Sequence, residues 1–213
     1  MKKINFLTFW LLLTVVVFNS CNTKNYLLTN DKGVIINGVK WATRNGDNPG
    51  TFAAKPEAPG MFFQWNRKAG WNVTDPMINS NGGTTWDGSD VIGATWEKSN
   101  DPSPVGWRIP SFDEIEKLLD ENKVKSEWTT VKGIKGRRFS DKTSGKSLFL
   151  PAVGRRSSDG TPDNAGSDGD YWSNTVHESH KANVYGLFFY SDGAYRSSSL
   201  RNYGLSVRCV ATK

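Results

Sequence analysis

Residues 110–119 read PSFDEIEKLL and contain the clearest helix signal in the chain. Ser111 can accept a hydrogen bond from the backbone of Glu114, whose side chain can return one to Ser111, the reciprocal pattern of a capping box. One apolar face is formed by Phe112, Ile115, Leu118 and Leu119. We expect a helix that starts after Pro110 and ends near Glu121 or Asn122.

Short aromatic or β-branched runs follow this helix, separated by Gly, Asp and Ser clusters. The predicted strands are residues 147–152, 170–175, 184–190, 194–198 and 205–210. Ser191-Asp192-Gly193 predicts a hairpin turn. Before the helix, Asn37-Gly38 predicts a tight hairpin of residues 34–36 with 39–41, because this dipeptide supplies positive φ angles. These elements predict an α+β fold: an antiparallel sheet with one or two helices and long irregular loops.

Residues 46–100 are rich in Gly, Pro, Asn and Trp and show no long helical period. We expect irregular loops here, with a short helix around Phe62 to Arg67. Eight tryptophans lie beyond Trp10, and we interpret most of them as core residues because each buries a large apolar area. Trp86, in a glycine-rich loop, is the one predicted to be exposed.

The N-terminus has the order of an export signal: Lys2 and Lys3, an apolar run from Phe6 to Phe18, and a small residue before Cys21. The run is shorter than the roughly 20 residues that a membrane-spanning helix needs. The motif resembles the lipobox of bacterial lipoproteins. We therefore predict a signal peptide at residues 1–20, lipidation of Cys21, a tether at residues 21–32 and one domain at residues 33–213.

This prediction places the protein in the cell envelope, anchored to the outer membrane. Two orientations are left as alternatives: the domain faces the cell surface or it faces the periplasm. Without Lys2 and Lys3 the net charge falls from +6 to +4, a mild excess that does not define a partner. Cys209 is the one remaining thiol, so no disulfide stabilises the predicted domain. We interpret Cys209 as an inert strand thiol, with a reactive or metal-binding thiol as the alternative.

An ordered series of motifs resembles a known family. The motifs are PVGWRIP at 104–110, EWTT at 127–130 followed by Gly133, Gly136 and Arg137, LFLPA at 148–152, YWS at 171–173, and GLSVRCV at 204–210. Residues 34–210 thereby resemble the Fibrobacter succinogenes major paralogous domain, common in lipoproteins of Bacteroides-type bacteria. The resemblance implies a C-type-lectin-like fold, related to the domain of formylglycine-generating enzymes, and no defined activity.

One position departs from the family pattern. Family members often have a cysteine where this chain has Ser103, and the resemblance implies that this cysteine pairs with the one at Cys209. The serine leaves Cys209 without that partner. Oxidation of a formylglycine type needs active-site thiols, so we predict that the chain is not an enzyme.

Loop residues able to contact a ligand form the candidate binding site. They are Trp86, Asp87, Arg155, Asp163, Asn164, His177, Tyr195 and Arg201. Flat aromatic rings can stack on sugars or anchor a protein interface. A basic run at Lys132, Lys135, Arg137, Arg138, Lys142 and Lys146, with Arg155 and Arg156 beyond it, is interpreted as a solvated face, with acidic polysaccharides or lipid headgroups as alternative partners.

No metal site is predicted. His177 and His180, the two histidines of the chain, are fewer than the three or four ligands of a zinc site. Asp159, Asp163, Asn164, Asp168 and Asp170 lie among glycines, which is typical of turns. Calcium remains a minority alternative for this loop.

We therefore predict a non-catalytic envelope lipoprotein, held by its lipid anchor, that acts as a binding or adhesion module for a glycan or protein. Nucleic acid is not an expected partner outside the cytoplasm. The first alternative is a structural or assembly subunit of an envelope or fimbria-like complex. The second is an enzyme of unknown type with a formylglycine-generating-enzyme-like fold, which needs a titratable pair in a cleft.

Overall fold

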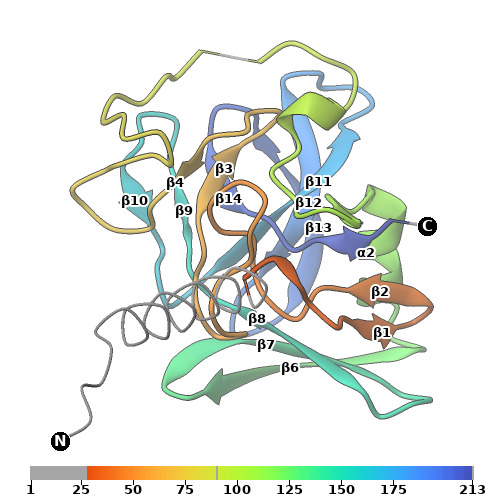
Figure 1. The fold of residues 1–213 in the computed structure, drawn as a ribbon. Helices are drawn as coiled ribbons and strands as arrows, with labels where there is room; N and C mark the ends of the chain where they lie inside the picture. Colours follow the sequence, from red (N-terminus) through yellow and green to blue (C-terminus); the bar gives the residue numbers. More distant parts are fainter. Residues whose placement is uncertain (1–27, 90, 213) are drawn as a thin grey trace, which may run out of the picture.

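A computed structural model describes residues 28–89 and 91–212. The predicted signal peptide, Cys21 and most of the predicted tether lie outside the described residues. The described chain is built mainly from antiparallel β-sheets with one α-helix, which confirms the α+β class (Figure 1). Within the described part of the chain, no helix is long and apolar enough to cross a membrane.

The first sheet brings the two ends of the described chain together. Its order is β1 (Val34–Ile36), β2 (Val39–Trp41), β15 (Val210–Ala211), β5 (Trp107–Arg108). Asn37 and Gly38 have φ angles of 44° and 77° between β1 and β2, the paired positive values of a tight hairpin. The predicted N-terminal hairpin is confirmed.

The largest sheet supplies the framework for the irregular loops. Its path is β10 (Pro162–Asp163), β9 (Arg155–Arg156), β14 (Gly204–Ser206), β11 (Gly169–Val176), β12 (Asn183–Phe189), β13 (Ala194–Leu200). β3 (Phe62–Gln64) also pairs with β14, and β4 (Gly70–Trp71) pairs with β3. The β11–β14 pairing is parallel and the other pairings are antiparallel.

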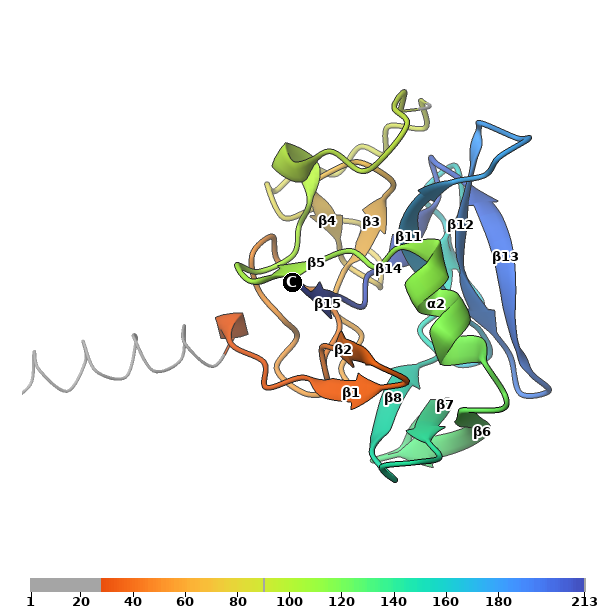
Figure 2. The same ribbon diagram turned by 90° about the vertical axis from the view of Figure 1, so that its right-hand side faces the viewer.

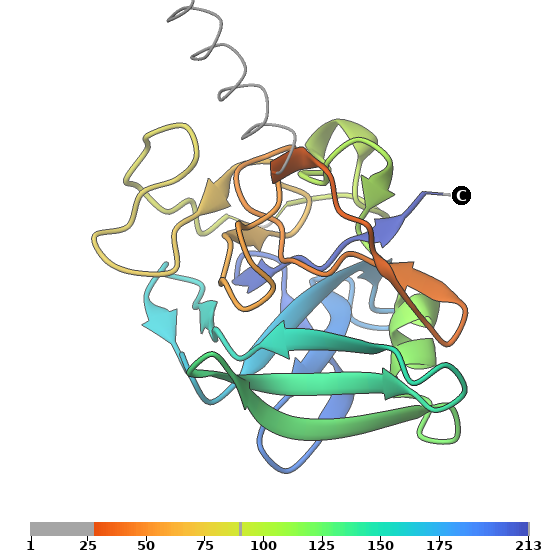
Figure 3. The same ribbon diagram turned by 60° about the horizontal axis from the view of Figure 1, so that its bottom comes forward.

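A three-stranded meander forms the third sheet: β6 (Val124–Val131), β7 (Ile134–Asp141) and β8 (Ser147–Pro151) (Figure 3). Lys132 and Gly133, with φ angles of 48° and 85°, form the tight turn between β6 and β7. The sequence did not predict this hairpin, because β6 and β7 are mostly charged or short polar residues. Only a few of their side chains, such as Val124 and Phe139, enter the core.

The predicted helix is α2 (Phe112–Leu119), which packs against β11, β12 and β13 (Figure 2). Both hydrogen bonds of the capping box are present between Ser111 and Glu114. Arg108 donates to both carboxylate oxygens of Glu114, at 2.7 and 2.8 Å, and so ties the helix start to β5. The helix ends earlier than expected because Asp120 is already extended, with ψ of 98°.

Two sequence predictions of local structure are wrong. The segment from Phe62 to Arg67 starts as strand β3 instead of forming a helix, and all three β3 residues are buried in the sheet. The single strand expected at residues 205–210 is two short strands, β14 and β15, which belong to different sheets. A three-residue 3-10 helix, η1 (Lys98–Asn100), was not indicated by the sequence.

Two hydrophobic clusters make the core. One joins α2, the meander and the ends of β11 and β12, and the other gathers around Trp65, Trp96 and Trp172. The buried tryptophans are Trp41, Trp65, Trp71, Trp96 and Trp172. The interpretation of most tryptophans as core residues is confirmed.

Candidate functional site

The long segment between β4 and η1 is the main irregular surface of the protein. We call residues 72–97 the strap loop; Asp90, within it, is outside the described residues. It crosses the end of the molecule near β3, β4 and the β11–β12 connection (Figure 1). Its second half is held by side chains that donate hydrogen bonds to its backbone carbonyls. These bonds take the place of the backbone hydrogen bonds of a β-strand, because the described part of this half forms no long strand.

These fastening contacts come from β3, from the turn after it and from the turn before β14. Gln64 Nε2 donates to the carbonyl of Asp87 at 2.7 Å, and Asn202 Nδ2 donates to that of Gly88 at 2.9 Å. Arg201 Nη1 donates to the carbonyls of Val91 and Gly93, both at 2.8 Å. The loop is therefore attached at several points along the chain from Asp87 to Gly93.

Arg201 is a structural clamp of this loop. Its side chain is buried, and its guanidinium lies 4.5 Å from the centre of the Trp65 ring. An arginine whose N–H groups donate to backbone carbonyls holds a loop in place and has fewer donors left to bind a ligand. Arg201, predicted from the sequence as a ligand contact, thus lies at the candidate site mainly as its support.

An open groove of about 750 Å³ lies between the strap loop and the β11–β12 connection. Its described lining is Val91, Ile92, Gly93, Ala94, Thr95, Asn174, Thr175, Val176, Lys181, Ala182 and Arg201. A bridge between Thr95 and Thr175 joins its two walls. Ile92 is 93% exposed at the rim. The groove combines apolar side chains, neutral polar groups and two cations.

Sequence reasoning missed most of this groove. Ile92 and Val91 carried a usable signal, since they are an apolar pair in a loop otherwise rich in Gly, Ser and Asp. Asn174 and Thr175 gave no signal, because they continue a predicted strand. Their place at the groove depends on how β11 meets the strap loop in three dimensions.

Trp86 lies on the strap loop but is half-buried, so its predicted exposure is wrong. Its ring packs on Trp71 with centroids 5.0 Å apart. A Cβ atom at Gly204 would stand 2.8 Å from the Trp86 ring, so the glycine makes room for the indole. The Trp86 Nε1 atom is buried without a hydrogen-bond partner among the described residues.

Asp87 is exposed and paired with Arg67. Hydrogen bonds from Arg67 and Ser89 hold the pKa of its carboxyl far below the ordinary value. The pair adds another attachment of the strap loop to the turn after β3.

Arg155, Asp163 and Asn164 belong to a second cluster, on β9, β10 and the turn after it. Arg155 pairs with Asp163 and with Asp170, each at 3.3 Å, and lies 5.5 Å from the Tyr203 ring centre. Asp170 is fully buried, and burial raises its pKa to about 6 against the opposing effect of Arg155. Asn164 occupies a turn with φ of 58°.

The acidic residues of this region serve turns and ion pairs. Asp159 accepts from the backbone N–H of Thr161 at 2.9 Å, and Asp163 and Asp170 face Arg155. Within residues 28–89 and 91–212, no three His, Cys, Asp or Glu side chains are placed to hold a metal ion.

His177 and His180 lie in the loop between β11 and β12. His177 Nδ1 accepts from the backbone N–H groups of Ser179 and His180, both at 3.2 Å, and its ring stacks on Tyr185 with centroids 4.6 Å apart. Neither histidine pairs with a carboxylate of the described chain. The sequence interpretation of a solvated loop between two strands is confirmed.

Tyr195 is far from the strap loop along the sheet. It is 46% exposed on β13, just after the turn from β12, whereas the groove borders the start of β12. The eight predicted ligand contacts therefore do not form one site.

The basic run is not a uniform solvated face. Arg137 and Arg156 are buried. Arg156 donates to the carbonyls of Asn72, Thr74 and Gly160 at 2.9, 2.6 and 2.6 Å, which holds the first part of the strap loop. The sequence could not reveal this because a buried and an exposed arginine look alike in a linear pattern.

Cys209 is fully buried, and its Sγ lies 3.2 Å from Ser103 Oγ. Burial raises the pKa of the thiol to about 12, so the neutral form is present at physiological pH. This agrees with the inert interpretation of Cys209.

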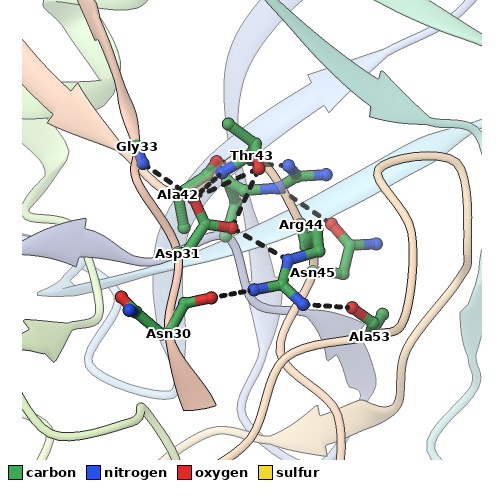
Figure 4. Close-up of polar contacts among 9 residues, drawn as sticks. Asn30, Asp31, Gly33, Ala42, Thr43, Arg44, Asn45 and Ala53 are labelled. Carbon is green, nitrogen blue, oxygen red and sulfur yellow. Dashed lines mark hydrogen bonds and ion pairs between the residues drawn. The ribbon is translucent and has the colours of Figure 1, made fainter. Parts of the chain in front are cut away.

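A buried polar network secures the start of the described domain (Figure 4). Asp31 accepts from Gly33, from Thr43 and from Arg44 Nε, the last at 3.0 Å. Burial alone would raise the pKa of Asp31, but these hydrogen bonds lower it. Packing therefore begins before residue 33, where the sequence placed the domain boundary.

Arg208 extends this network through the core. Its Nε donates to Asn45 Oδ1 at 3.0 Å, and Asn45 Nδ2 lies 3.3 Å from the Tyr171 hydroxyl. That hydroxyl donates to the carbonyl of Pro151 at 2.8 Å. We call Asp31, Thr43, Arg44, Asn45, Tyr171 and Arg208 the Asp31 network.

Comparison with known proteins gave no assignment: the chain matches no protein-family model, no curated protein and no solved structure. The geometry of the described residues is therefore the basis for a functional proposal.

Proposed function

We propose that this protein is a non-catalytic binding or adhesion module of the cell envelope, which takes a glycan or protein ligand in the groove beside the strap loop. The observation that carries the proposal is the fastening of an irregular loop at several carbonyls next to an open groove. A loop fixed before binding loses less conformational entropy when a ligand arrives. Grooves of several hundred Å³ are typical of ligand sites.

The chemistry of the lining also favours binding. Its described residues include no carboxylate, histidine or cysteine, the side chains that most often act as general acids, bases or nucleophiles. Ile92 offers an exposed apolar contact, while Asn174 and Thr175 offer hydrogen bonds. Such a mixture suits a sugar face or a peptide.

The anchor at Cys21 and the family are further parts of the proposal. Ser103 and Cys209 touch, which is what a divergent member of the Fibrobacter succinogenes major paralogous domain with a lost disulfide would have. The pairing of β2 with β15, which joins the two ends of the described chain, and the long loops are consistent with a C-type-lectin-like fold. Fatty-acid labelling of wild type and Cys21→Ala tests the anchor.

The binding test uses residues 22–213 on a glycan array and on immobilised envelope proteins. Ile92→Ser should lose most of the signal of any specific ligand. Ile35→Ser is the matched control, because Ile35 is 50% exposed on β1 and lies outside the groove. Equal loss in both variants, or no ligand across both panels, would contradict the proposal.

One observation favours the alternative of an assembly subunit. β13 pairs with β12 along all seven residues and has no strand on its other side within the described chain. An unprotected edge can add a strand from another chain. Sedimentation analysis of wild type and Ser197→Lys tests this: loss of an oligomer in the variant would support assembly, and a monomer in both would count against it.

A further inference from the structure

A second groove, of about 380 Å³, lies at the opposite end of the β12–β13 pair from the strap loop. It is bounded by the end of α2, by β6 and β7, and by the turn that joins β12 to β13. The charged and aromatic residues of its lining are Glu121, Lys125, Arg137, Lys142, Asp192 and Tyr195. None of these residues lines the groove beside the strap loop.

Arg137 is the central residue of this second groove. It is only 7% exposed. Its Nε donates to Ser126 Oγ at 2.5 Å, and its Nη1 donates to the carbonyl of Tyr190 at 2.7 Å. These two contacts fix the plane of the guanidinium.

Asp192 stabilises the charge of Arg137 from beyond ion-pair distance. No carboxylate of the described residues lies within ion-pair distance of it, in contrast to Arg156, which pairs with Asp75. Its Nη2 has no hydrogen-bond partner, yet it is not among the fully buried unpartnered atoms of the described chain. Nη2 is therefore accessible from the groove that Arg137 lines.

Aromatic and charged groups surround this open donor. Tyr195 is 46% exposed, and its ring lies 6.2 Å from that of Tyr190, centroid to centroid. Lys125 forms an ion pair with Glu127, and Lys142 donates a hydrogen bond to the carbonyl of Glu121. Asp192 and Glu121, both in the lining, are the carboxylates that would repel an anion.

We propose that this groove binds a carboxylated sugar, with the sugar carboxylate on Arg137 and the ring against Tyr195. A fixed guanidinium with an open donor suits a carboxylate. A neighbouring exposed aromatic ring suits the apolar face of a pyranose. The site is independent of the groove beside the strap loop, so either one can fail while the other holds.

The test is calorimetric titration of residues 22–213 with trigalacturonate, and with its methyl ester as the matched neutral ligand. Wild type should bind the acid, and the ester should bind at least about tenfold more weakly. Tyr195→Ala should weaken acid binding by about tenfold, and Asp192→Asn should strengthen it by about twofold to fivefold. Arg196→Gln, which removes an arginine of the same strand outside the groove, should leave the affinity unchanged.

Arg137→Gln should abolish binding, and circular dichroism checks that this variant is folded. Equal affinity for the acid and the ester would overturn the proposal. So would an affinity unaffected by Tyr195→Ala, or no binding of the acid at millimolar concentration. Tighter binding of an oligoglutamate peptide than of trigalacturonate would overturn it in favour of an acidic protein segment.

Discussion

The Asp31 network and the strap loop both depend on arginine side chains, but they use them differently. In the Asp31 network, Arg44 and Arg208 are inside the protein and face a carboxylate, an amide and backbone carbonyls of the core. At the strap loop, Arg201 reaches from the turn between β13 and β14 to the carbonyls of a surface segment. The first arrangement secures the fold, and the second shapes a surface.

This difference gives the two regions different sensitivities to mutation. Losing a buried counter-charge leaves other charges unpaired in a low-dielectric interior, which is costly. Losing a loop clamp exposes its carbonyls to water, which can replace the bonds. We therefore expect large effects on stability from the network and smaller ones from the strap loop.

The largest effect is expected from Asp31→Ala. The Asp31 side chain is completely buried and that of Arg44 is 11% exposed, so the variant should lose about 3–5 kcal/mol of unfolding free energy. Urea denaturation measures this loss. Glu116→Ala, which removes an exposed ion pair with Arg196, is the control and should cost less than about 1 kcal/mol. Similar losses in both would show that the network is not a special source of stability.

An engineered disulfide between positions 103 and 209, next to Arg208 of the Asp31 network, should stabilise the folded protein. Since Ser103 Oγ and Cys209 Sγ are 3.2 Å apart, Ser103→Cys should oxidise to a bond with Cys209. The cross-link should add about 3 kcal/mol to the unfolding free energy. Thiol titration measures whether the bond forms, and denaturation with and without reductant measures the gain in stability. Ser103→Ala is the control. A variant that keeps two free thiols in oxidant would contradict the contact.

The pH dependence of the unfolding free energy should reveal the titration of Asp170, in the cluster on β9, β10 and β11. Because burial raises the pKa of Asp170 to about 6 from 3.8, the folded state binds this proton more tightly than the unfolded state. This contribution to stability is complete at low pH and is lost as the pH rises from about 4 to 6. The loss is about 3 kcal/mol.

Asp170→Asn stays neutral and should remove that decline, as urea denaturation at several pH values would show. Asp47 is the comparison, because burial also raises its pKa, although by less. Asp47→Asn should leave most of the decline in place. A decline that persists unchanged in Asp170→Asn would assign the titration to another group.

The smallest effect on stability is expected from Arg201→Met. The methionine keeps an apolar side chain near Trp65 but cannot donate to the carbonyls of Val91 and Gly93. The variant should lose about 1 kcal/mol of unfolding free energy, while residues 91–95 become mobile and ligand affinity falls. A stability loss as large as that of Asp31→Ala would remove the contrast between the two regions.

Local signals in the sequence predicted the elements whose cause is local. Asn37-Gly38 determines its own turn, and Ser111 with Glu114 determines its own cap. β3 was misassigned because Phe62–Gln64 is buried on both sides and has no alternation to identify it. β6 and β7 were missed because most of their residues are polar and show no apolar pattern typical of a strand. Their pairing depends on the packing of the meander as a whole.

The binding surface was harder to predict than the fold. Arg155, Arg201 and Asp163 have the chemistry of ligand contacts, yet their partners are two carboxylates, backbone carbonyls and an arginine of the same chain. Arg155 and Asp163 are only eight residues apart, but Arg201 and Val91 are separated by 110 residues. A linear pattern contains no information on which donors are already occupied.

The central claim is that the strap loop is a fixed surface before any ligand binds. Amide ¹⁵N relaxation on the free protein tests it most directly, by comparing residues 86–95 with β11 and β12. We predict order parameters of about 0.8 or more in the loop, close to those of the strands. Values below about 0.6 across residues 86–95 would mean that the clamps do not hold the loop, and would contradict the account.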